Sequence, residues 1–180
     1  MILSDNALNH LFIVSDWLYS YFLTNSFKGL EKDILSLSIY YDAIYMFGID
    51  KNLRNGIRIE TCANYNGEFV TTSFDIVTLE KVIKDLGISY IISNKPTAYL
   101  CNAAYYHMLK RNRNTVFIHI PSTKGMNPSL MNKLLQMVWV ASFLSTRPRK
   151  KAHLQRRCAF FNEIRLRRVK FGFAKWNSFA

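Results

Sequence analysis

The sequence of 180 residues has only three cysteines, Cys62, Cys101 and Cys158, and their spacing suggests neither disulfide pairs nor a metal site. There is no C-x-x-C motif and no zinc-ligand pattern of cysteines and histidines, which argues against a structural zinc domain. A small, odd number of cysteines also argues against a disulfide framework. The cysteine content therefore favours a protein of a reducing compartment.

The chain also lacks an apolar run long enough to cross a bilayer. Its best candidates are 11–23, which contains Asp16, and 134–144, which contains Gln136. Both are shorter than the roughly 20 residues that a membrane helix needs. The N-terminus lacks a basic region followed by an apolar stretch and a cleavage site, so we expect no signal peptide and no membrane partner.

Acidic residues are scarce, with 12 Asp and Glu against 24 Lys and Arg, and the net charge is +12. Residues 147–180 hold eleven of the basic residues and one acid, Glu163, which gives this segment a charge of +10. Such a tail can bind phosphate groups or an anionic surface, but a solvated extension is the favoured interpretation over nucleic-acid contact. We predict one domain over residues 1–146 and a basic C-terminal tail over 147–180.

About half of the residues are apolar, enough for one domain with a real core. Segments with helical apolar spacing alternate with short apolar strands. This alternation predicts an α/β fold, a three-layer sandwich with a mostly parallel central sheet. Residues 3–26 predict a strand followed by a helix, and 65–71 predict a loop. The other expected strands are 42–49, 56–60, 88–93 and 115–120, and the other expected helices are 27–37, 74–86, 99–110 and 128–144.

Cys101 is the strongest candidate for chemistry, because it lies where a strand-like run gives way to a helix-like one. A thiol at a helix start faces the positive end of the helix dipole, which favours the thiolate. A second strand delivers His119, which can serve as the base for a cysteine nucleophile. Glu60 ends another strand, and we expect all three residues on one rim of the sheet, at the carboxyl ends of the strands. Asp50 is the less favoured alternative acid.

Two motifs resemble those of the pyroglutamyl-peptidase I family, also called pyrrolidone-carboxylate peptidases. The stretch Tyr99-Leu100-Cys101-Asn102 resembles the family's nucleophile motif, and Phe117-Ile118-His119-Ile120-Pro121 resembles the motif that carries its catalytic histidine. The segment 57–60 resembles the strand that carries the family's catalytic glutamate. The similar region runs from about Tyr41 to Leu144.

This resemblance implies a phosphorylase/hydrolase-like fold and a cysteine exopeptidase that removes N-terminal pyroglutamate from peptides. Cys101 would be the nucleophile, His119 the base and then the acid, and Glu60 the residue that orients the imidazole. The resemblance also implies that no metal or organic cofactor is needed, that the protein is cytoplasmic and that it forms homo-oligomers.

The sequence departs from the family pattern in several places. The family's first strand and its Gly-Phe-x-Pro-Phe-Gly-type substrate loop have no counterpart, which would leave a sheet edge or core face uncovered. Val70 stands where the family has an arginine near the site. Pro96-Thr97 replaces an Ala-Gly turn, and threonine adopts a positive φ less readily than glycine. The alternative function is therefore a catalytically impaired relative that serves as a scaffold or binding subunit.

Overall fold

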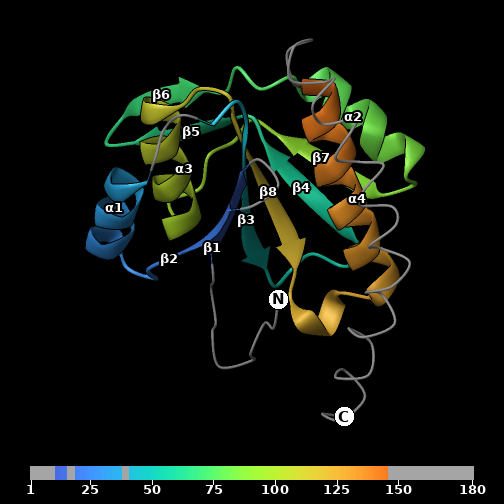
Figure 1. The fold of residues 1–180 in the computed structure, drawn as a ribbon. Helices are drawn as coiled ribbons and strands as arrows, with labels where there is room; N and C mark the ends of the chain where they lie inside the picture. Colours follow the sequence, from blue (N-terminus) through green and yellow to red (C-terminus); the bar gives the residue numbers. More distant parts are fainter. Residues whose placement is uncertain (1–10, 16–18, 38–40, 146–180) are drawn as a thin grey trace. The chain divides into compact units, whose positions relative to one another are not determined.

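The computed structural model describes residues 11–15, 19–37 and 41–145. Six strands form one sheet in the order β2-β1-β3-β8-β4-β7, and two further strands form a separate β5-β6 hairpin (Figure 1). The strands, in chain order, are β1 (Leu11–Ser15), β2 (Tyr19–Leu23), β3 (Ile44–Asp50), β4 (Gly56–Glu60), β5 (Cys62–Tyr65), β6 (Glu68–Thr71), β7 (Ser89–Ser93) and β8 (Thr115–Pro121).

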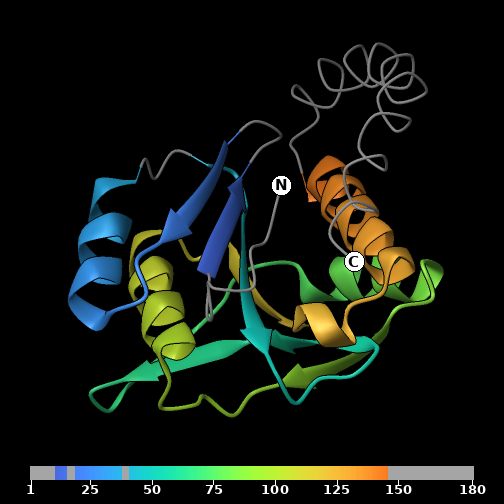
Figure 2. The same cartoon turned by 90° about the horizontal axis from the view of Figure 1, so that it is seen from below.

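Two pairs of helices cover the two faces of the sheet. Helices α1 (Phe27–Ser36) and α3 (Leu100–Arg111) lie on one side, and α2 (Ile76–Asp85) and α4 (Pro128–Ser145) lie on the other, as the turned view shows (Figure 2). A short 3-10 helix, η1 (Thr123–Gly125), precedes α4. Each face has its own apolar core. The α/β fold of three layers is thus as the sequence predicted.

The strand directions explain how the sheet is built. β3 runs parallel to β8, and β4 runs parallel to β7. β8 and β4 are antiparallel to each other, and β1 is antiparallel to both β2 and β3. The sheet consists of two parallel pairs joined through the antiparallel contact between β8 and β4, with an N-terminal hairpin at one edge. An uncovered sheet edge or core face was expected, but β1 pairs with β3, so the N-terminal hairpin covers that side of β3.

Two segments differ from the expected elements. A strand followed by a helix was expected over 3–26, but residues 19–23 form a second strand, because their aromatic side chains suit a hairpin with β1. Residues 65–71 were expected to be a loop, but they include β6 and a turn. Asn66 and Gly67 in that turn have φ values of 51° and 83°. An Asn-Gly pair is a strong signal for a tight hairpin turn, and the sequence analysis missed it.

The helix that precedes β7 shows why the remaining elements were predictable. Asp75 caps α2 by accepting a hydrogen bond from the Thr78 amide at 3.0 Å. Gly87 follows its end with a φ of 60°, a conformation that suits glycine and stops the helix as expected. Between these signals Leu79, Val82 and Ile83 are buried. In the described part of the chain, no helix has the length and apolar character to pass through a membrane.

Candidate active site

Three adjacent strands bring the candidate residues onto the face that α3 covers. In the sheet, His119 of β8 lies opposite Gly48 of β3 on one side and opposite Arg58 of β4 on the other. Side chains alternate along a strand, so Arg58 and Glu60 share this face while Ile57 and Ile59 join the core on the other face. The candidates therefore meet on a sheet face. The expectation of a common rim at the carboxyl ends was wrong, because β4 runs antiparallel to β8.

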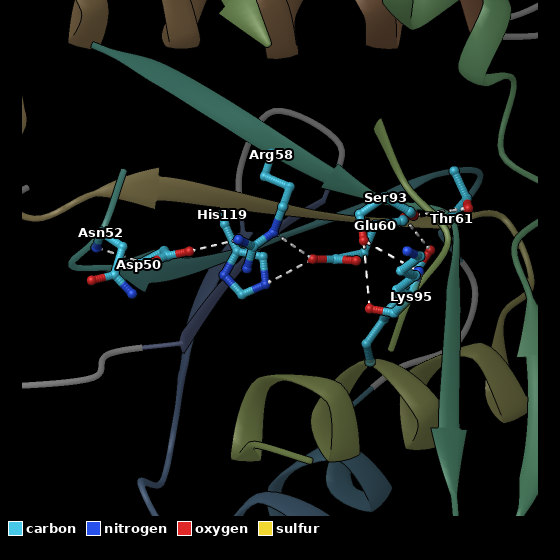
Figure 3. Close-up of polar contacts among 9 residues, drawn as sticks. Asp50, Asn52, Arg58, Glu60, Thr61, Ser93, Lys95 and His119 are labelled. Atoms are coloured by element: carbon cyan, nitrogen blue, oxygen red, sulfur yellow. Dashed lines mark hydrogen bonds and ion pairs between the residues drawn. The ribbon is translucent and has the colours of Figure 1, made fainter. Parts of the chain in front are cut away.

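His119 and Glu60 form a buried pair. The Nε2 atom of His119 lies 3.3 Å from Oε1 of Glu60, and each residue is only 6% exposed (Figure 3). His119 Nδ1 and Glu60 Oε2 are buried and have no hydrogen-bond partner. If Nε2 carries the proton and donates a hydrogen bond to the carboxylate, Nδ1 is left with a lone pair that can accept a proton. The pairing thus presents Nδ1 as the basic atom.

Glu60 is ionised despite its burial. Burial by itself would raise the pKa of Glu60, but hydrogen bonds from His119, Ser93 and Arg58 outweigh it and hold the pKa below its usual value. The Nε atom of Arg58 donates to Glu60 Oε1 at 2.8 Å. The phenol of Tyr105 donates to the Glu60 backbone carbonyl at 3.0 Å and so attaches α3 to the end of β4.

Cys101 is the second residue of α3 and packs closely against β3. A Cβ added at Gly48 would lie 3.0 Å from the Cys101 Sγ and 2.7 Å from a ring carbon of Phe117. Burial raises the pKa of Cys101 to about 11, and the charges of Asp50 and Glu60 contribute in the same direction. Burial therefore opposes the thiolate that the position at the helix start was expected to favour. Catalysis at Cys101 would need a base.

Cys101, His119 and Glu60 line one small cleft together with Pro96, Thr97 and other residues. Its free volume is about 10 Å³, which is about the space of a single water molecule. In the described residues, positive φ values outside glycine occur at Asn55 and Asn66. Thr97 thus takes the place of the family's glycine without the strained backbone that the sequence suggested.

The other titratable candidates have structural partners. Asp50 faces Arg58 with 2.8 Å between its Oδ2 and the guanidinium, so this alternative acid pairs with Arg58. Cys62 lines the cleft, but its thiol donates to the Asn94 carbonyl at 3.2 Å, and burial raises its pKa. Cys158 and the basic tail lie outside the described residues. Among the residues that the structure describes, no group of three or more His, Cys, Asp or Glu could hold a metal ion.

A larger hollow adjoins the cleft. It has a volume of about 370 Å³ and shares Pro96, Thr97 and Asn102 with the cleft. The Asn102 side chain bonds both backbone groups of Asn64, which holds the β5-β6 hairpin beside the start of α3. The hollow's aromatic lining comes from Phe27, Tyr65, Phe69 and Tyr99.

Sequence reasoning missed both Arg58 and this hollow. Arg58 was quoted only as part of the strand that leads to Glu60, although its spacing of two residues from Glu60 places both side chains on one face. The hollow depends on the β5-β6 hairpin, of which residues 65–71 had been expected to form a loop. The Asn66-Gly67 turn was the signal that could have revealed it.

Comparison with known proteins gives matches at the level of structure. No family model matches the sequence, and no curated protein matches it. The crystal structure of pyrrolidone carboxyl peptidase from Thermus thermophilus is similar with a TM-score of 0.52 and 17% identity, over 68% of this chain and 79% of that chain. The enzyme from Fervidobacterium islandicum gives a TM-score of 0.47 and 18% identity, over 68% and 77% of the two chains. A mutant enzyme from Pyrococcus furiosus gives 0.45 and 23%, over 64% and 73%.

The similarity to the Thermus structure establishes the class of fold. This chain has the α/β fold of the pyrrolidone carboxyl peptidases, as the motifs around Cys101 and His119 predicted. An identity of 17% supports the fold alone, so the role of each site residue rests on the geometry described above.

Proposed function

We propose that this chain is a cysteine exopeptidase that removes pyroglutamate from the N-terminus of peptides. The observation that carries the proposal is the buried His119–Glu60 pair, which lines one small cleft together with Cys101 and leaves His119 Nδ1 without a hydrogen-bond partner. A nucleophile, a base and a group that orients the base are the three parts that such catalysis requires.

In the proposed reaction, the Cys101 Sγ attacks the carbonyl carbon of the pyroglutamyl residue while His119 Nδ1 takes the thiol proton. The imidazolium is stabilised by the Glu60 carboxylate, and backbone N–H groups at the start of α3 stabilise the oxyanion. His119 then gives its proton to the nitrogen of the leaving amine, and the C–N bond breaks to leave a thioester on Cys101. His119 next deprotonates water, which attacks the thioester and releases pyroglutamate, and Cys101 regains its proton.

The lining of the adjoining hollow suits a substrate whose N-terminal residue is uncharged. None of its lining residues, all within the described part of the chain, carries an acidic or basic side chain. An ordinary N-terminal ammonium group would need a carboxylate to replace its hydration. The lactam ring of pyroglutamate is uncharged and can be held by apolar contacts and hydrogen bonds. We therefore prefer a pyroglutamyl peptidase to a general aminopeptidase.

The second candidate is an impaired relative that acts as a scaffold or binding subunit. The cleft of about 10 Å³ and the raised pKa of Cys101 favour this alternative, because a substrate must open the cleft and a base must first ionise the thiol. The family resemblance further predicts a cytoplasmic homo-oligomer, which sedimentation of the purified protein and its localisation in cells would test.

The decisive experiment is the release of a fluorescent amine from a pyroglutamyl amide by the purified protein. Cys101→Ser is the matched inactive variant, and Cys158→Ser, in the predicted basic tail, is the thiol control that should keep full turnover. Alanyl and leucyl amides test for aminopeptidase activity. Turnover of the pyroglutamyl amide alone, lost in Cys101→Ser, would establish the function. A protein that is folded by circular dichroism but has no turnover would favour the impaired relative.

A further inference from the structure

Arg58 joins two strands that do not pair with each other. Its Nε donates to Glu60 on its own strand at 2.8 Å, and its Nη1 lies 2.8 Å from Oδ2 of Asp50 at the end of β3. β8 lies between these two strands, so the guanidinium spans the strand that carries His119. Figure 3 shows the chain of contacts from Asp50 through Arg58 to Glu60. Asp50 is itself held by the Asn52 amide, which donates to its other oxygen at 2.9 Å.

The same oxygen of Glu60 faces both Arg58 and His119. Oε1 accepts from the Arg58 Nε and lies 3.3 Å from His119 Nε2, while Oε2 has no partner. A partial turn of the carboxylate about its last bond would move Oε1 away from both Arg58 and His119. A guanidinium fork that is itself fixed at its far end prevents this rotation, because its N–H groups have a rigid geometry.

We propose that Arg58, anchored by Asp50, is a positioning residue that keeps the Glu60 carboxylate ionised and aimed at His119 Nε2. This inference rests on the proposed peptidase function for its catalytic meaning, but its structural content can be tested separately. Arg58 acts through Glu60, and Glu60 fixes the tautomer of His119 that leaves Nδ1 free as the base.

Charge balance explains why the anchor is needed. Burial would neutralise Glu60 if its ionised form lost the hydrogen bonds that favour it. Arg58 is half-buried, so Asp50 compensates its charge in turn. The titratable or charged groups around the His119–Glu60 pair come from four elements: Asp50 in β3, Arg58 in β4, Cys62 in β5, and Cys101 and Tyr105 in α3.

The test replaces Arg58 in two ways and reads the state of His119 directly. Arg58→Met keeps the length of the stem but removes the charge and both contacts, whereas Arg58→Lys keeps the charge and loses the fork. Nitrogen NMR of the imidazole distinguishes the tautomer protonated at Nε2 from that protonated at Nδ1. We expect the Nε2-protonated tautomer in the unsubstituted protein, a mixture in Arg58→Met and an intermediate result in Arg58→Lys.

The second readout is the pH profile of turnover. Without Arg58, the pKa of Glu60 should rise because one of the hydrogen bonds that oppose the effect of burial is lost, so the acid limb of kcat/KM should move to higher pH. We expect kcat/KM at neutral pH to fall roughly 10- to 100-fold in Arg58→Met, as misplacement of a catalytic group typically causes. Arg113→Met is the matched control, because Arg113 is exposed and its side chain donates to the Thr71 hydroxyl instead of Glu60.

The outcomes separate the two proposals. A folded Arg58→Met protein with an unchanged tautomer and an unchanged pH profile would overturn the positioning role. If Arg58→Met does not fold, Asp50→Asn tests the same anchor from its other end, since it keeps the oxygen that accepts from Asn52, and an unchanged tautomer there would also overturn the role. A tautomer change in a protein without peptidase turnover would support Arg58 and refute the proposed function.

Discussion

Gly48 shows how a single residue limits the position of the candidate nucleophile. It occupies a strand position where any side chain would press on Cys101 and Phe117. The sulfur can therefore approach the sheet as closely as a backbone allows. β3 contributes no catalytic group to the proposed mechanism. It nevertheless determines how closely the Cys101 thiol packs against the sheet.

Gly48→Ala is expected to destabilise the fold and displace the thiol. Overpacking of this kind typically costs about 1–3 kcal/mol. Urea unfolding should show the loss of stability, and turnover per folded molecule should fall with it. Gly125→Ala is the control, because a Cβ there would lie 3.2 Å from the Leu53 carbonyl and from Pro121 instead of Cys101. Equal turnover losses in both variants would contradict a specific effect on the thiol.

The reactivity of Cys101 without substrate should follow its raised pKa. Iodoacetamide reacts with the thiolate, so the alkylation rate should keep rising from neutral pH towards about pH 11, the pKa that burial gives this thiol. The measurement uses a Cys62→Ser, Cys158→Ser background, in which Cys101 is the remaining cysteine. A rate that levels off below about pH 8, near or under the ordinary thiol pKa, would show instead a resting thiolate–imidazolium pair.

At the scale of elements, the β5-β6 hairpin is attached to α3 through one side chain. Asn102 bonds both the amide and the carbonyl of Asn64, as a neighbouring strand would. The same residue follows Cys101 directly and lines both the cleft and the hollow. The hairpin, the start of α3 and the candidate nucleophile are therefore coupled.

Asn102→Ala is expected to release the hairpin from α3. Two partly buried backbone groups would lose their partners, at a cost of about 1–3 kcal/mol. Hydrogen exchange of the Asn64 amide should become faster, while exchange in β3 and β8 should change much less. Asn52→Ala is the control, since Asn52 contacts Asp50 through its backbone amide. Unchanged protection of Asn64 would show that the hairpin is held by other contacts.

The elements that sequence could predict are those with local signals. The buried run of β8, the capped helix α2 with Gly87 at its end, and the helix that begins at Leu100 were all expected close to their observed bounds. The resemblance of the motifs around Cys101, His119 and Glu60 to the family also pointed to residues that the fold brings to one cleft. The direction of β4 was not predictable, because pairing with β8 is a non-local contact across more than fifty residues.

Two properties of the site could not be predicted from the sequence, because they also depend on non-local packing. The raised pKa of Cys101 follows from burial, which depends on how α3 packs on β3. The proposed role of Arg58 depends on Asp50. These residues meet because β3 and β4 lie on either side of β8, an arrangement that depends on non-local pairing. Residue type and helix position alone could not reveal the burial that raises the pKa of Cys101.

At the scale of the whole molecule, the described domain accounts for the fold that resembles the peptidases. The basic residues concentrate in 147–180, outside the elements that form the sheet and the candidate site. The interpretation of this segment as a solvated tail stays a prediction. It predicts that residues 147–180 can be removed without loss of the proposed activity.

A chain that ends at Ser145 should retain the turnover of the full chain. The shortened chain lacks eleven basic residues and one acid, so any salt-dependent binding of single-stranded RNA should be abolished. Fluorescence anisotropy between about 50 and 200 mM salt gives the binding slope. Loss of turnover in a folded shortened chain would show that the tail contributes to the site. RNA binding that persists without the tail would place that property in the domain.

The central place of β8 has a consequence for the order in which the protein is made. β3 and β4 leave the ribosome first, but the strand that belongs between them is synthesised more than fifty residues later. Until that strand emerges, Asp50 and Glu60 have no His119 between them and Cys101 has no base. On the proposed mechanism, the growing chain therefore contains its nucleophile before its base, and the site forms only when β8 completes the sheet.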